Sequence, residues 1–225
     1  MSDSVDYTRR DQVLESVRKK RGYTLSYHQL FASLNPELLS RYDSFYEALT
    51  LLQGHLEPKE KELVWIAILA IADEEAGSIH LKRAEKVGIT TDEIAVSLSI
   101  AQLVKGFRIW PFVQKNWKSD LPNLDEYATY DSIVDRVVGS SGLDPKLVEL
   151  IFIGAATTNA DAALLEHHFI RAETIGVPEE KIAEAMSFII IPRGGNMLLD
   201  MANVLRDVVA SKKVKPTTIF KIWET

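Results

Sequence analysis

The sequence predicts an all-α protein made of two tandem helical units behind an N-terminal helical extension. Three observations lead to this fold class. Apolar residues recur every three or four positions, as they do on the buried face of a helix. No stretch combines the alternation of a strand with β-branched residues bounded by turns. One block of about 55 residues also occurs twice along the chain, which indicates an internal duplication.

The duplication is visible when residues 80–99 are aligned with residues 168–187. The identical pairs, all at an offset of 88, are His80/His168, Arg83/Arg171, Ala84/Ala172, Glu85/Glu173, Gly88/Gly176, Ile94/Ile182, Ala95/Ala183 and Ser99/Ser187. Unrelated segments of this length share only about one or two such identities. Upstream, residues 56–67 match residues 143–154 at an offset of 87, so one residue is inserted between the two blocks of the second copy.

Each copy predicts three helices. The first helix begins with an acidic residue followed by proline (57–58 and 144–145), which suits an N-cap and a first helical position. The second carries the repeated histidine and ends near a glycine, Gly88 or Gly176. The third begins in the first copy at a capping-box pattern, residues 90–93.

The remaining segments set the expected boundaries. Two further helices, separated at Asn35-Pro36, precede the first repeat, and the polar, turn-rich residues 115–130 are the expected linker. The end of the chain either docks through Ile219, Phe220 and Trp223 or is loosely held. We divide the chain into an N-terminal lead-in (1–54), a first repeat (55–114), a linker with a helix (115–140), a second repeat (141–212) and a C-terminal tail (213–225).

Composition excludes several classes of function. A net charge of −6 argues against nucleic-acid binding, which requires a concentrated basic surface. The absence of cysteine excludes disulfides, cysteine zinc sites and thiol chemistry, and it is compatible with a reducing cytosol. The longest apolar run, residues 63–72, is shorter than the roughly 18 residues of a membrane helix, and no secretory signal is visible. We therefore expect a cytoplasmic protein without a membrane partner.

The repeated motif resembles a known family. In both copies, L-x-P-K-x-x-E-L is followed by H-x-x-R-A-x-x-x-G, which resembles the carboxymuconolactone decarboxylase family, including its alkylhydroperoxidase D-like members. The resemblance covers about half the chain and extends weakly to the lead-in. It implies tandem units of that helical fold. Because one fold hosts different reactions, it does not by itself fix the chemistry.

The thiol branch of that family is excluded by the residues present. There, two cysteines lie seven and four residues before the histidine, at the start of the same helix. The corresponding residues are Asp73 and Ala76 in the first copy and Asp161 and Leu164 in the second. None of these side chains can form the thiolate that attacks a peroxide.

The decarboxylase branch requires no cysteine. Such a reaction requires a cation or donor for the substrate carboxylate, a donor for the dienolate and an acid that protonates carbon. The candidate catalytic residues are the repeated Glu62, His80, Glu149 and His168, and the candidate substrate-binding residues are Glu75, Lys105, Arg108 and Arg193. The alternative for each Glu–His pair is a structural hydrogen bond at the edge of the core. We expect neither a metal site nor a cofactor.

Three functions remain open. The first is a cofactor-independent, decarboxylase-type enzyme (a lyase) acting on a small organic acid or lactone. The second is a non-catalytic scaffold or ligand-binding protein, and the third, which has only the family label behind it, is peroxide removal without a thiol. A Glu–His pair that opens onto a pocket with a cation would favour the enzyme. We also expect a homo-oligomer, since short helical units expose apolar faces that require partners.

Overall fold

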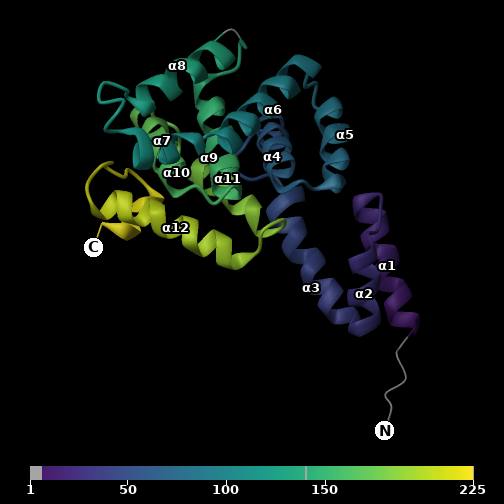
Figure 1. Ribbon diagram of the computed structural model, residues 1–225. Helices are drawn as coiled ribbons and strands as arrows, with labels where there is room; N and C mark the ends of the chain where they lie inside the picture. Colours follow the sequence, from purple (N-terminus) through teal and green to yellow (C-terminus); the bar gives the residue numbers. More distant parts are fainter. Residues whose placement is uncertain (1–6, 140, 225) are drawn as a thin grey trace. The chain divides into compact units, whose positions relative to one another are not determined.

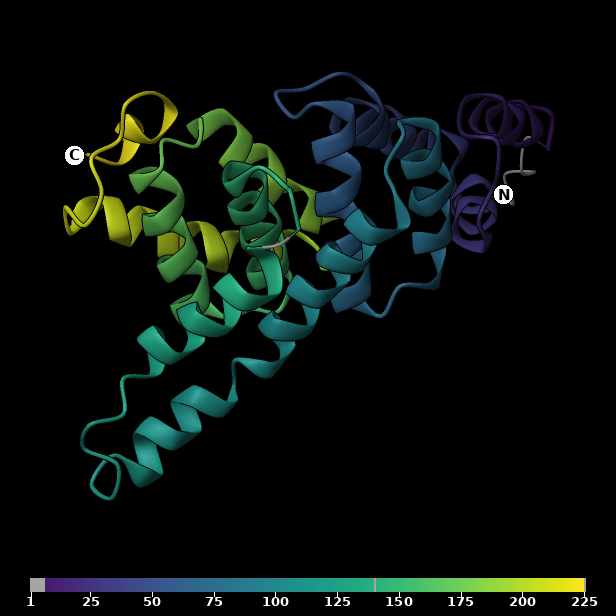
Figure 2. The ribbon, with the colours of Figure 1, turned by 90° about the horizontal axis from the view of Figure 1, so that it is seen from above.

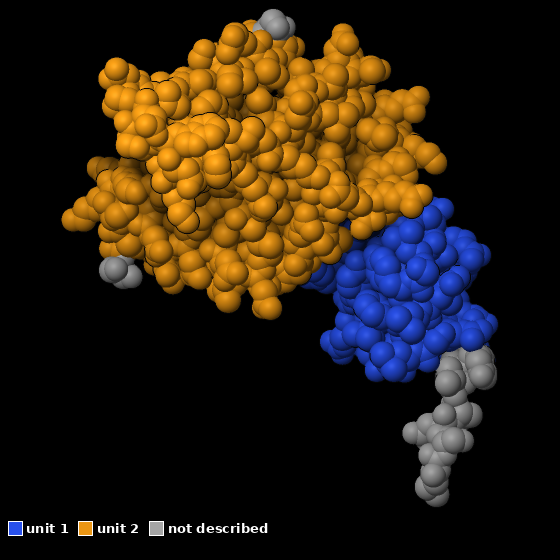
Figure 3. Space-filling view, in the orientation of Figure 1, with its two compact units in different colours: residues 1–52 blue, residues 53–225 orange. Residues whose placement is uncertain are grey.

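The structure, a computed structural model that describes residues 7–139 and 141–224, consists of helices joined by loops, and the described residues contain no strand (Figure 1). This confirms the all-α prediction. The chain forms two compact units, residues 1–52 and 53–225, and Figure 3 colours them separately. The predicted lead-in, residues 1–54, extends two residues beyond the end of the first unit.

The first unit is a small helical bundle. It contains α1 (Tyr7–Arg21), α2 (Ser26–Leu34), α3 (Pro36–Tyr46) and the short π-helix η1 (Glu47–Leu51). The Asn35 side chain accepts a hydrogen bond from the Glu37 N–H at 3.0 Å, so the predicted cap of α3 is present. Its apolar core consists of Val13, Val17, Ala32 and Leu39.

A buried ion pair joins α1 to α3 within this unit. The Arg21 guanidinium lies 2.7 Å from the Asp43 carboxylate and 3.7 Å above the Tyr46 ring. Lys20 bonds the other Asp43 oxygen at 2.8 Å, and the Tyr42 hydroxyl lies 2.9 Å from that of Tyr27. Both Tyr42 and Asp43 are thus engaged by side chains of the first unit.

The second unit contains both repeats. The first comprises α4 (Pro58–Ala72), η2 (Glu75–Gly77), α5 (Ser78–Lys86), α6 (Thr91–Gly106) and α7 (Ile109–Trp117). The second comprises α8 (Glu126–Val138), α9 (Pro145–Thr158), α10 (Ala162–Thr174), α11 (Glu179–Ser187), η3 (Phe188–Ile190), α12 (Gly195–Ala210) and η4 (Ile219–Trp223). Figure 2 shows α8 returning alongside α6 after the loop that follows α7. That loop, residues 118–125, is shorter than the predicted linker because Asp125 caps α8.

The core of the second unit is the packing of α4 against α9. Most residues of the two helices are buried, which explains why their sequences are largely apolar. The helices are in close contact at Gly154. A Cβ atom there would lie 3.0 Å from Val64 and 3.2 Å from Ile68. The absence of a side chain at this position therefore permits the contact between the two repeats.

The C-terminal tail docks through a buried carboxylate that sequence analysis did not identify. Glu179 accepts hydrogen bonds from the backbone N–H groups of Thr217, Thr218 and Phe220 and from both threonine hydroxyls. Burial alone would raise the pKa of Glu179, but these donors outweigh burial and lower it. Phe220 is buried against Phe169, whereas Ile219 stays exposed.

Filling the contact between the repeats is expected to destabilise the second unit. Gly154→Val introduces methyl groups against Val64 and Ile68, and overpacking of this kind costs about 1–3 kcal/mol. Chemical denaturation measures the free energy of unfolding. Gly106→Val, at a helix end with open space around its Cα, is the matched control and is expected to change stability little. Equal losses in the two variants would refute the close contact.

Removing one Glu179 oxygen is expected to release the tail. In Glu179→Gln the amide group presents a donor to backbone N–H groups, so part of the five-bond cage is lost. Limited trypsin digestion at Lys221 is expected to accelerate, whereas Glu180→Gln is the neutral control. In the wild type, docking of the tail is complete at neutral pH. It weakens as the pH falls below the ordinary pKa of glutamate, because the pKa of Glu179 is lowered in the folded protein. Unchanged digestion of the Gln variant would contradict this role.

Candidate functional site

The structure brings the four predicted catalytic residues together as two pairs. The Glu62 carboxylate on α4 lies 2.8 Å from the Nδ1 atom of His80 on α5. The Glu149 carboxylate on α9 lies 2.7 Å from Nδ1 of His168 on α10. All four side chains are largely buried, with His80 5% and His168 0% exposed. Each pair links the central helix of its repeat to the next helix.

In the second repeat, the histidine is closed off on every side. Its Nδ1–H donates to Glu149, so Nε2 is an acceptor, and the Tyr130 hydroxyl donates to it at 3.0 Å. The ring of Phe152 stacks on the imidazole with 3.9 Å between the centroids. Burial lowers the pKa of His168, so the ring is neutral.

Charged groups around this pair are also matched. Arg171 donates to the second Glu149 oxygen at 2.9 Å and lies 3.0 Å from Asp131. Asp131 also accepts from His167 at 2.8 Å. Burial alone would raise the pKa of Glu149, but His168 and Arg171 outweigh it and keep the carboxylate ionised. All of these groups are therefore paired within the second repeat.

The first repeat has the same pair with different surroundings. No described residue bonds the Nε2 atom of His80. Arg83, the equivalent of Arg171, makes no ion pair with a described residue, and its buried Nη1 has no partner there. Trp65 stands where the second repeat has Phe152 and stacks on His80 at 4.8 Å, and its buried Nε1–H is also without a partner in residues 7–139 and 141–224. Two buried polar atoms of this repeat, Nη1 of Arg83 and Nε1 of Trp65, therefore lack a partner among the described residues.

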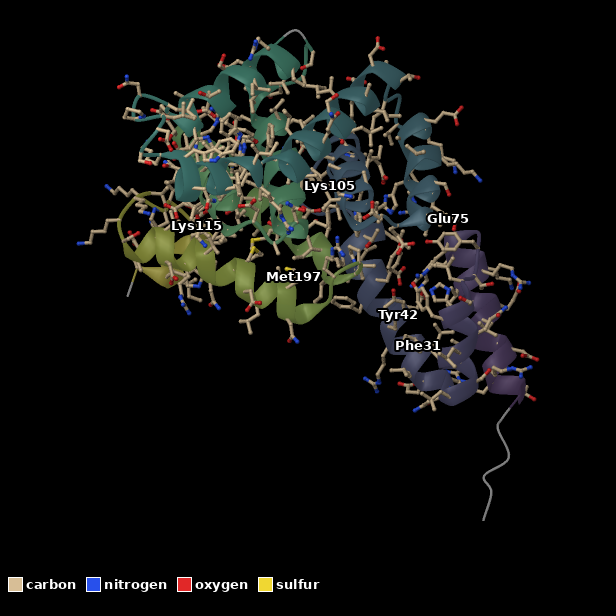
Figure 4. All side chains as sticks on the ribbon, viewed as in Figure 1. Phe31, Tyr42, Glu75, Lys105, Lys115 and Met197 are labelled. Carbon is tan, nitrogen blue, oxygen red and sulfur yellow. The ribbon has the colours of Figure 1, made fainter. Side chains whose placement is uncertain are left out.

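A pocket of about 390 Å³ adjoins this helix pair. It lies among the end of α4, the η2 turn, the start of α5 and one residue of α6. The lining residues are Ile66, Leu69, Ala70, Asp73, Glu74, Glu75, Gly77, Ser78, Leu81 and Leu98. Glu75, labelled in Figure 4, is the one predicted substrate-binding residue among them. Glu62 and His80 are not in the lining, so the pocket and the Glu–His pair are separate features of the same repeat.

A difference of one residue explains why the first repeat has this pocket. In both copies a residue with positive φ ends the central helix, Asp73 (φ 56°) or Ala160 (φ 55°). The second copy continues directly into α10, and its Leu164 and Leu165 are fully buried. In the first copy a tight 3₁₀ turn precedes α5, and the small residues Ala76 and Gly77 occupy the equivalent positions. The space filled by two leucines in one copy is thereby left open in the other.

Of the three predicted substrate-binding cations, Lys105 and Arg193 lie at the C-terminal end of α4 and Arg108 lies apart from it. Lys105, labelled in Figure 4, bonds Asp73 at 2.8 Å and lowers the pKa of that carboxyl. Arg193, the residue equivalent to Lys105 in the second repeat, donates to the carbonyl of Ile71 at 3.1 Å. Both cations are favourable beside the negative end of the helix dipole. Arg108 is exposed at the start of α7 and does not line the pocket.

The comparison with protein families agrees with this duplicated architecture. The model described as "Carboxymuconolactone decarboxylase family" matches residues 36–109 and 125–207, which together exceed half of the chain. The chain belongs to the carboxymuconolactone decarboxylase family. No curated protein matches it. The two matched segments confirm the tandem arrangement inferred from the motifs.

The family match extends each repeat to one further helix. The first segment begins with α3 and the second at the residue that caps α8. These helices share the sequence Tyr-Asp-Ser, at residues 42–44 and 130–132, again at an offset of 88. The aligned blocks of the sequence analysis did not include this shared tripeptide, which indicates that Tyr130 and Asp131 belong with the second repeat. Trp65 and Arg83 were likewise not predicted as site residues.

No described helix of this carboxymuconolactone decarboxylase family member has the length and apolar character needed to cross a membrane. Within residues 7–139 and 141–224, no group of three or more potential ligands could hold a metal ion. The neighbouring Glu166 and His167 illustrate why, because His167 is bonded to Asp131 and Glu166 to Lys213.

Removing the Tyr130 hydroxyl is expected to destabilise the protein through His168. Tyr130→Phe leaves the buried Nε2 of a neutral imidazole without a donor, and such an unpaired group costs about 1–3 kcal/mol. The free energy of unfolding by urea measures the effect. Tyr127→Phe, a partly buried tyrosine of the same helix, is the control. A Tyr130→Phe variant as stable as the wild type would show that this bond does not close the second repeat.

Proposed function

We propose that the first repeat is the catalytic half of this protein, and that it carries out a cofactor-independent, decarboxylase-type reaction on a small organic acid or lactone. One observation carries the proposal. His80 keeps the Glu62 hydrogen bond at Nδ1 but has an unoccupied Nε2 among the described residues, whereas Nε2 of His168 is held by Tyr130. An imidazole with one oriented nitrogen and one free nitrogen is suited to proton transfer.

Each group has a defined part in the proposed reaction. The carbon–carbon bond to the leaving carboxylate breaks, carbon dioxide departs, and the electron pair remains as an enolate. His80 then takes up a proton from solvent at Nε2 and delivers it to carbon. Glu62 is a positioning residue, because its carboxylate fixes Nδ1–H and stabilises the imidazolium. Binding of the substrate carboxylate is a separate requirement.

The pocket supports a second candidate function, the binding of a small ligand without catalysis. Its walls are mainly apolar side chains, and neither Glu62 nor His80 lines it. A pocket of this size can enclose a small organic molecule. In this alternative the Glu–His pair of the first repeat stabilises the wall of the pocket and takes no part in a reaction.

Self-association stays a prediction. It is supported by α7, where Ile109, Phe112 and Trp117 are each at least half exposed. Sedimentation of the full-length protein would test it.

A paired substitution separates catalysis from binding. His80→Gln and His168→Gln are compared against a panel of small carboxylic acids and lactones. We expect His80→Gln to lower kcat of the folded protein by about 10²–10⁴-fold, the usual contribution of general acid catalysis. We expect His168→Gln to lower the unfolding midpoint and to leave kcat of the folded protein nearly unchanged.

Two outcomes would refute the enzyme. Equal turnover in wild type and His80→Gln would exclude a proton-transfer role for His80. Saturable binding of a panel member without turnover in any variant would favour the second candidate.

A further inference from the structure

The unsatisfied groups of the first repeat have partners of known chemistry in the second repeat. There, a hydroxyl donates to Nε2 of His168, and a carboxylate pairs with Arg171. Both groups belong to consecutive residues of α8, Tyr130 and Asp131. The equivalent atoms of the first repeat, Nε2 of His80 and Nη1 of Arg83, have no partner among the described residues.

We infer that Arg83 and Trp65, together with His80, bind a small hydroxycarboxylic acid that supplies to the first repeat the hydroxyl and the carboxylate that Tyr130 and Asp131 supply to the second. This inference rests on the proposed function, because it assigns the substrate class to the same histidine. It adds Arg83 and Trp65, which the sequence analysis did not select, as ligand-binding residues.

Burial makes the unpaired atoms informative. Buried polar side-chain atoms nearly always have a partner, because leaving one unpaired costs free energy. Trp65 is 1% exposed, and its Nε1–H has no partner in the part of the chain that the structure describes. The second repeat avoids that cost with Phe152, whose ring makes the same stacking contact without a polar atom. A tryptophan here is therefore useful if an acceptor oxygen reaches it.

Charge complementarity points to one carboxylate. In the second repeat, Arg171 lies between two carboxylates, Glu149 and Asp131. In the first repeat the guanidinium of Arg83 makes no ion pair with a described carboxylate, and Ile79 occupies the position equivalent to His167. One ligand carboxylate would restore an ion pair to Arg83, as planar guanidinium groups favour.

The first repeat also has sequence equivalents of the two α8 residues, Tyr42 and Asp43. In the structure both are engaged inside the first unit, Asp43 by Arg21 and Lys20 and Tyr42 by Tyr27.

The test uses the full-length protein and 4-hydroxyphenylacetate as the probe, with phenylacetate and phenol as its two halves. Binding is measured by calorimetry and by the indole N–H resonances in a ¹H–¹⁵N spectrum, in which Trp65→Phe assigns the Trp65 signal. We expect the probe to move the Trp65 resonance and to leave those of the three other tryptophans in place. We expect it to bind at least tenfold more tightly than either half, because each half satisfies one group only.

Matched variants identify the carboxylate partner. Arg83→Gln is expected to weaken binding of the probe and of phenylacetate at least tenfold while leaving phenol affinity unchanged. Arg171→Gln, the equivalent change in the closed repeat, is expected to lower stability without changing affinity. Lys105→Gln, at the edge of the neighbouring pocket, controls for a general loss of positive charge.

The outcomes separate this inference from the proposed function. Failure of every probe to move the Trp65 signal, as when ordered water alone occupies the site, would overturn the inference. So would equal affinities of wild type and Arg83→Gln. Binding that depends on Arg83 but gives no turnover would support the inference and refute catalysis. Turnover lost in His80→Gln but unaffected in Arg83→Gln would support catalysis and refute the inference.

Discussion

Each repeat is organised around a buried hydrogen bond between a glutamate on its central helix and a histidine on the next helix. A carboxylate in this position would be costly without a partner, because α4 and α9 are surrounded by apolar side chains. The bond therefore requires the histidine helix to pack at one register against the central helix. In turn, that packing positions the turn before the histidine helix, where the pocket of the first repeat lies.

The two copies keep this bond and differ in several of the groups that surround it. In the second repeat, α8 supplies a hydroxyl and a carboxylate, and Phe152 closes the ring face. The first repeat replaces that phenylalanine with Trp65, leaves Arg83 unpaired among the described residues, and shortens the turn by one residue. The surroundings, and not the shared pair, distinguish the two copies.

Most of the fold was predictable because its determinants are local. The caps at Asn35 and Thr90 and the glycines that end the histidine helices are read directly from short sequence patterns. The Glu62–His80 and Glu149–His168 pairs were predictable because both recur at a nearly constant offset. By contrast, the attachment of the tail through Glu179 depends on residues 38 to 41 positions apart, and no local pattern signals it. The unpaired state of Arg83 is also invisible in sequence, since its equivalent Arg171 is identical and fully paired.

The central claim is that the imidazoles of His80 and His168 have the same proton position and different Nε2 surroundings. A long-range ¹H–¹⁵N spectrum of the histidine rings tests it most directly, with His→Gln variants assigning the signals. The account predicts that both rings carry the proton on Nδ1, that Nε2 of His168 shows a hydrogen bond lost in Tyr130→Phe, and that a small hydroxycarboxylic acid moves Nε2 of His80 alone. Identical Nε2 signals in the two rings, unchanged by any added acid, would contradict it.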